Sequence, residues 1–154
     1  MPGIFHQSGC CGGQPCVDCG GSQPDIPQAN VSVSGSCDSV CATADDGDYQ
    51  FQGFVSDECY WYWYGPQFGF DGTWEIRIQY HPSEGRWEAW LQATQSEVPN
   101  HAEFHSSNVS GISCNSSTGH LEGTFTLDGV DSGTNNADCS GCTATITLTR
   151  LMTV

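Results

Sequence analysis

Apolar and polar side chains alternate one by one along most of the chain after about residue 29, and this pattern restricts the fold more than any other feature. In residues 74–80, for example, Trp, Ile, Ile and Tyr alternate with Glu, Arg and Gln. A period of two residues is typical of a β-strand that buries one face, whereas an amphipathic helix repeats every ~3.6 residues. No stretch of comparable length follows the helical period, so the sequence predicts an all-β fold.

The same alternation predicts several short strands separated by polar turns. They lie within residues 30–34, 49–55, 59–64, 74–80, 87–93, 121–127 and 143–149. The turn at residues 81–85 contains Pro82 and Gly85 and joins two of these strands as a hairpin. We therefore expect an antiparallel β-sandwich, or a distorted barrel, of about seven or eight strands.

The first 28 residues differ from the rest, because they are rich in Cys, Gly and Pro and poor in large apolar side chains. Such a segment cannot bury a core by itself. We expect an N-terminal arm at residues 1–28 and a β-sandwich domain at residues 29–154. The arm carries Cys10, Cys11, Cys16 and Cys19, which we expect to form disulfides, with a zinc knuckle as the alternative.

Ten cysteines in 154 residues predict covalent cross-links. Six of them fall within the β domain: Cys37, Cys41, Cys59, Cys114, Cys139 and Cys142. Our preferred pairing joins the first doublet to the last and leaves Cys59 with Cys114, because long closed loops stabilise most. Local bridges within the doublets, and a zinc ion held by the two doublets, remain alternatives.

The charge of the chain excludes some partners. The formal net charge is −15, with 18 acidic residues against three cations, all of them arginine. Such a surface repels phosphate backbones and anionic membranes, so we expect no binding to nucleic acid. No apolar run approaches the ~20 residues that span a bilayer, so we expect no membrane insertion.

The aromatic run at residues 60–64 is the most informative apolar feature. Alternation places Trp61 and Trp63 on one face of a strand and Tyr60, Tyr62 and Tyr64 on the other. Trp90 likewise points away from the side that carries Trp87, Ala89 and Leu91. We expect Tyr60, Tyr62, Tyr64 and Trp90 to form a subunit interface, or else a platform on which sugars stack.

No residues are grouped with the spacing of a catalytic site, so we expect no enzyme activity. The pair His101 and His105 resembles a metalloprotease motif only superficially, and we expect exposed loop histidines. Glu75 and Glu88 could face each other across the hairpin, although acids on a solvated face are commoner. We expect no cofactor; the alternatives are zinc in the arm and calcium at Asp45, Asp46 and Asp48.

The start MPGIF, the CCGG cluster at residues 10–13 and the segments at 121–127 and 139–149 are similar to small cysteine-rich β proteins of environmental bacteria and their phages. The resemblance implies an extracellular or virion structural role and no particular activity. The start also lacks the pattern of a signal peptide.

We therefore expect a non-enzymatic structural protein of an extracellular assembly, made in the cytosol and oxidised after release. A phage capsid decoration, tail or fibre subunit fits this description best. It would dock through its arm and an aromatic face onto other assembly proteins or copies of itself. A carbohydrate-binding module and a small zinc protein are the alternatives.

Overall fold

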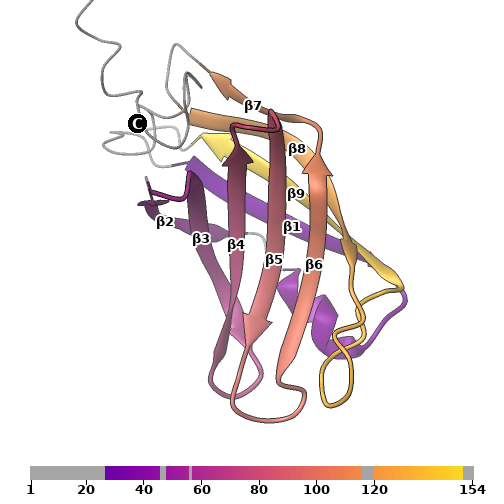
Figure 1. Cartoon of the computed structure of the whole chain (residues 1–154). Coiled ribbons are helices and arrows are strands. Elements are labelled where there is room, and N and C mark those ends of the chain that lie inside the picture. Colours follow the sequence, from indigo (N-terminus) through magenta and orange to yellow (C-terminus); the bar gives the residue numbers. More distant parts are fainter. Residues whose placement is uncertain (1–26, 46–47, 56, 116–119, 151–154) are drawn as a thin grey trace, which may run out of the picture.

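The computed structural model describes residues 27–45, 48–55, 57–115 and 120–150 (Figure 1). The predicted arm with Cys10, Cys11, Cys16 and Cys19 lies outside these residues. The described part is almost entirely antiparallel β, which confirms the predicted class. Its strands are β1 Pro27–Gly35, β2 Tyr49–Val55, β3 Tyr60–Phe68, β4 Gly72–His81, β5 Arg86–Thr94, β6 His101–Val109, β7 Ile112–Asn115, β8 His120–Gly129 and β9 Cys142–Arg150, and a short 3-10 helix, η3, spans Ser39–Ala44.

The strands close into a barrel. Strands β1 to β5 each pair with the next, β8 pairs with β9, and β9 returns to β1. Strand β8 pairs with β7 over its first residues and with β6 over its last, so eight strands form the closed ring and β7 is added to it. Of the two architectures expected from the sequence, the structure is therefore the barrel.

The barrel is flattened, because two of its seams are short. Strands β1 and β9 pair over their whole lengths, from Pro27↔Arg150 to Gly35↔Cys142. By contrast, β1 meets β2 only at Gln28 and Ala29, and β6 meets β8 only at Phe104 and His105. In Figure 1 strands β3 to β6 form a front layer, and β1, β8 and β9 cross behind it. The result is two layers joined at narrow edges, which explains why a sandwich and a distorted barrel both fitted the sequence.

Apolar side chains fill the space between the two layers. The front layer contributes Trp61 and Trp63 from β3, both almost fully buried, and the back layer contributes Phe125 and Ile146. Strands β4 and β5 supply every second side chain, as the alternation predicted. In β2 a bulge between Phe51 and Gly53 breaks the alternation, so both Phe51 and Phe54 pack against the core. Burial of one such side chain contributes about 1.5–3 kcal/mol. The largest fully buried side chains are Trp63, Trp74, Tyr49, Phe68, Phe104, Ile76, Ile78, Leu91, Leu127 and Ile146.

The expectation that His101 and His105 lie in an exposed loop is wrong, because both belong to strand β6 and are half-buried. The inward positions of this strand include Ala102, whose single methyl group gives a weak apolar signal, and Phe104. The alternation was therefore harder to recognise here than in residues 74–80.

Two disulfides join the segment after β1 to the start of β9. Cys37 bonds to Cys142, and Cys41 of η3 bonds to Cys139. This joins the first doublet to the last, as the sequence favoured, and leaves these four sulfurs unavailable as zinc ligands. Cys59 is also buried and disulfide-bonded, but the side chain of Cys114 lies outside the described side chains, so that pairing stays a prediction.

Helix η3 packs against the interior through buried Cys41 and Ala44. The indole Nε1 of Trp74 donates a hydrogen bond to the Thr43 hydroxyl over 2.9 Å, and the Tyr49 hydroxyl donates to the Ala44 carbonyl over 2.8 Å. Both aromatic side chains are fully buried, so these bonds satisfy polar atoms that water cannot reach.

The two disulfides should stabilise the fold in a non-additive way. Either one alone closes a loop of about 100 residues, whereas the second then closes a ring of only about nine, made of residues 37–41 and 139–142. In the chain-entropy model, replacing one pair by serine costs about 2.6 kcal/mol, and replacing both costs about 7 kcal/mol. Urea unfolding of Cys37→Ser/Cys142→Ser, of Cys41→Ser/Cys139→Ser and of the quadruple variant measures these free energies. Equal and additive losses would contradict the nested arrangement.

Candidate functional site

The outer face of strands β3 to β6 carries the aromatic side chains that the sequence singled out. Trp61 and Trp63 are 3% and 0% exposed, so the alternating side chains Tyr60, Tyr62 and Tyr64 point outward. Tyr64 is 44% exposed. The tyrosine side of β3 is therefore the outer one, a question that alternation alone left open.

Strand pairing lines up one side chain from each of four strands across this face. Tyr62 of β3 pairs with Arg77 of β4, which pairs with Trp90 of β5. Trp90 pairs in turn with His105 of β6, and their rings stack with centroids 5.3 Å apart and an interplanar angle of 20°. All four side chains are half-buried. We call Tyr62, Arg77, Trp90 and His105 the aromatic row.

Arg77 connects the row to its neighbours. Its guanidinium carbon lies 4.3 Å from the centroid of the Tyr60 ring, which is a cation–π contact. One terminal nitrogen lies 3.6 Å from a carboxylate oxygen of Glu75. Its Nε is buried and has no hydrogen-bond partner among the described residues. A buried donor without an acceptor costs about 1–3 kcal/mol.

Next to the row, Glu88 accepts hydrogen bonds from two histidines. The Nε2 atoms of His81 and His105 each lie 2.7 Å from one of its carboxylate oxygens. A carboxylate only accepts, so both Nε2 atoms carry the proton. Arg86 adds a contact at 3.6 Å. Partial burial raises the pKa of Glu88, but the bonds from His105 and His81 outweigh it and hold the pKa below its ordinary value.

The other histidine of the sequence motif is also tied to the sheet. His101 Nε2 lies 3.0 Å from a carboxylate oxygen of Glu103, and its Nδ1 lies 3.2 Å from the Thr94 hydroxyl. His101 and His105 are thus each held by a different glutamate. They do not converge on one point as metal ligands on a helix would.

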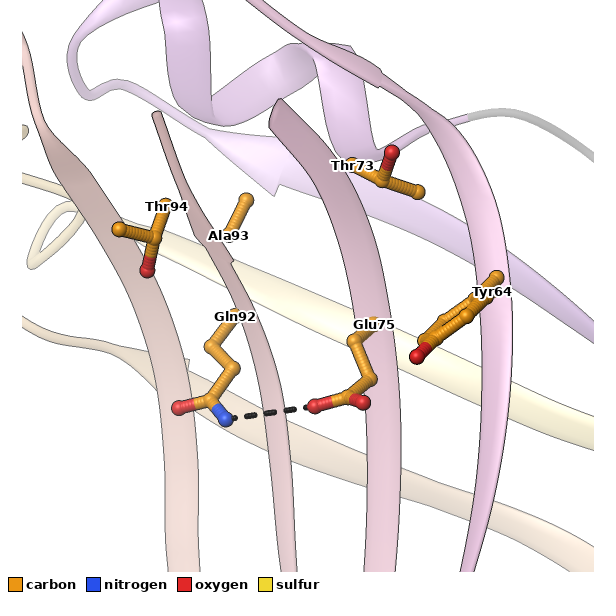
Figure 2. Close-up of a pocket in the computed structure, with 6 residues that line it drawn as sticks. All are labelled: Tyr64, Thr73, Glu75, Gln92, Ala93 and Thr94. Carbon is orange, nitrogen blue, oxygen red and sulfur yellow. Dashed lines mark hydrogen bonds between the residues drawn. The ribbon is translucent and has the colours of Figure 1, made fainter. Parts of the chain in front are cut away.

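A hollow of about 390 Å³ lies beside the aromatic row, on strands β3, β4 and β5 (Figure 2). Tyr64 forms one wall, and Glu75 and Gln92 lie next to it on the two following strands. The Gln92 amide donates to a Glu75 carboxylate oxygen over a long 3.5 Å. The hydroxyls of Thr73 and Thr94 complete the polar lining.

The acidic turns are tied to neighbouring backbone and hydroxyl groups. Asp45 accepts a hydrogen bond from the backbone N–H of Val33, and Asp71 accepts two from Ser96 that lower the pKa of its carboxyl. Of the other two candidate calcium ligands, Asp46 lies outside the described residues and Asp48 is exposed. No group of three or more His, Cys, Asp or Glu in the described ranges is placed to hold a metal ion.

The hairpin register separates Glu75 and Glu88, the two glutamates that could have faced each other across the hairpin. Glu75 lies opposite Gln92, and Glu88 lies opposite Gln79. Sequence reasoning found Tyr62 and Trp90 but missed that Arg77 lies between them. Counting outward from the pair His81↔Arg86 at the turn would have placed Arg77 opposite Trp90.

The described residues define a small antiparallel β-barrel with a filled core, two disulfides and a polar, aromatic outer face. No protein-family model, no curated protein and no solved structure matches the chain. Within the described residues, no helix has the length and apolar character needed to cross a membrane.

Glu88→Gln should destabilise the protein by about 1–3 kcal/mol at pH 7, because one of the two accepting oxygens becomes an NH₂ group that faces a histidine N–H, and the remaining hydrogen bond loses its charge. The folded-state pKa of Glu88 lies below its ordinary value of 4.5, so its contribution is fully present above pH 4.5 and is lost as the pH falls through the folded pKa. The difference between wild type and variant should therefore shrink below pH 4.5.

Urea unfolding of both proteins between pH 7 and pH 3 measures this difference. Asp57→Asn, which removes one carboxylate from an exposed turn, is the control and should stay within about 0.5 kcal/mol of wild type at pH 7. A difference in unfolding free energy between wild type and Glu88→Gln that grows as the pH falls would contradict the lowered pKa of Glu88.

Proposed function

We propose that this protein is a non-enzymatic structural component of an extracellular assembly, and that the aromatic row is its contact with a second copy of the chain. The observation that carries the proposal is the alignment of Tyr62, Arg77, Trp90 and His105 across the outer face of the sheet.

The composition of the row supports a protein interface. Tyr, Trp and Arg are the residue types that contribute most of the binding energy at such interfaces. The Trp90 and His105 rings are already stacked, and Arg77 lies over Tyr60. Side chains held in this way lose little conformational freedom on docking, so less of the contact energy is spent on ordering them.

The distribution of charge supports a second copy as the partner. Two copies that each carry −15 repel one another at long range. Arg77 and Arg86, two of the three cationic side chains of the chain, both lie on this face, together with Glu75 and Glu88. A face with both signs can pair with itself about a two-fold axis, because an arginine of one copy can lie opposite a carboxylate of the other.

The two disulfides fit an oxidising, extracellular setting. We extend the proposal to a phage virion subunit, which the resemblance of residues 121–127 and 139–149 to small phage and bacterial β proteins supports. In that setting the protein would be oxidised on release, and the fixed barrel would present the row to neighbouring subunits.

Sedimentation of the full-length oxidised chain over a range of concentrations tests self-association. Wild type should form dimers or larger species, and Trp90→Ala should weaken association about 30-fold, which corresponds to the ~2 kcal/mol of an interface hot spot. Phe70→Ala is the matched control, since Phe70 is 74% exposed in the turn between β3 and β4, away from the row. A wild-type chain that stays monomeric, or an equal effect of both variants, would overturn the proposal.

A further inference from the structure

The geometry points to a binding site for a neutral pyranose sugar in the hollow beside the aromatic row, with the sugar stacked on Tyr64 and hydrogen-bonded to Glu75 and Gln92. This inference goes beyond the proposed self-association. It rests on a different set of side chains, which line one connected space (Figure 2).

A bulge in β3 shapes the hollow. Tyr64 pairs with Glu75, but the next pair is Gln67 with Thr73, so β3 contains one more residue than β4 between them. Gly65 lies in this bulge, and a Cβ atom there would lie 2.3 Å from the ring of buried Tyr49. The backbone beside Tyr64 is therefore fixed by the core, which makes the wall of the hollow a preformed feature.

Tyr64 offers the stacking surface. It is one of few large aromatic or aliphatic side chains that the described structure leaves more than a third exposed. The C–H groups on one face of a pyranose are apolar and weakly positive, and the face of an aromatic ring is negative. The Tyr62 ring, two residues earlier on the same strand, contacts the Tyr64 ring, with the two centroids 5.8 Å apart.

The polar groups match the hydroxyls of a sugar. The Glu75 carboxylate can accept from two adjacent hydroxyls, and the Gln92 amide can both donate and accept. The bond between them is long, at 3.5 Å, so a ligand that replaces it loses little. The Thr73 hydroxyl can donate and accept, and the Thr94 hydroxyl, whose proton lies toward His101 Nδ1, can still accept at the far side of the hollow.

Charge selects against acidic sugars. Glu75 lies in the hollow, and the nearest cation in the ion pairs described, Arg77, already lies 3.6 Å from it. The chain as a whole carries −15. A uronate, sulfate or phosphate would therefore meet a repulsive field, whereas a neutral hexose would not.

The size of the hollow sets the expected strength. About 390 Å³ is near the lower end of the range of ~300–1,000 Å³ for small-molecule sites. The hollow is an open depression that covers one face of a ligand, so binding should be weak, with a Kd of about 1 mM for a single sugar.

Titration of the full oxidised chain, followed by ¹H–¹⁵N NMR spectra, tests the site. The probes are the methyl glycosides of glucose, galactose, mannose and N-acetylglucosamine, with glucuronic acid as the charged counterpart. At least one neutral probe should saturate and shift the amide signals of Tyr64, Glu75 and Gln92, and glucuronic acid should bind at least tenfold more weakly.

Three variants separate the roles of the side chains. Tyr64→Ala should weaken sugar binding at least tenfold, and Gln92→Ala should weaken it at least fivefold. Glu75→Gln should remove the preference against glucuronic acid. Gln79→Ala is the matched control for Gln92, because it lies on the same face one strand away and does not line the hollow. It should change the Kd by less than twofold.

Three results would overturn the inference: no shift with any neutral sugar at about ten times the expected Kd, wild-type affinity in Tyr64→Ala, or equal binding of glucuronic acid by the wild-type chain. Each leaves the sedimentation result for Trp90→Ala unaffected. A wild-type chain that stays monomeric but binds a neutral sugar would overturn only the proposed docking.

Discussion

The contact between the first and last strands of the described sheet is the constraint on which the rest of the structure depends. Strands β1 and β9 are more than 100 residues apart in sequence and still pair along their full lengths, beside the two disulfides that join Cys37 to Cys142 and Cys41 to Cys139. Contacts between such distant segments have the largest entropic cost of formation. Cross-links next to this seam reduce the number of unfolded conformations and hold η3 against the core. The short seams at β1/β2 and β6/β8 depend on this closure, because two residue pairs alone would hold neither in place.

The core determines what the outer face presents. Successive side chains of a strand point to opposite faces, so burial of Trp61 and Trp63 in the core turns Tyr60, Tyr62 and Tyr64 outward. Pairing with β4, β5 and β6 then brings Arg77, Trp90 and His105 into line with Tyr62. The outer face is thus a direct product of the alternation that builds the core, and the hollow lies where the bulge after Tyr64 interrupts that alternation.

Much of this architecture could be predicted from the sequence, because a half-buried strand shows its period of two locally. The strands around residues 49–55, 60–64, 74–80, 87–93, 121–127 and 143–149 were expected and are present. The stretch after Pro99 looks strand-like, but His101 and His105 were expected in an exposed loop, since the inward Ala102 of β6 gives little signal. The hollow could not be predicted, because it depends on the bulge between Tyr64 and Gln67, and a one-residue irregularity leaves no periodic trace. The Arg77–Trp90 pair could have been found by counting from the hairpin turn, whereas its extension to His105 required the pairing of β5 with β6.

The arginines also affect how the barrel is oriented as it approaches a charged surface. Arg77 and Arg86 lie on one side of the barrel, while carboxylates such as Asp38, Asp45 and Asp138 lie exposed around η3 and the loop before β9. Glu75 and Glu88 lie on the arginine side too, so the arginines offset part of the acidic charge there. A strongly anionic surface therefore repels the arginine side less than the side around η3, and the barrel should approach it with the arginine side first. This alignment acts over about one Debye length, ~8–10 Å at physiological ionic strength, and fades as salt is added.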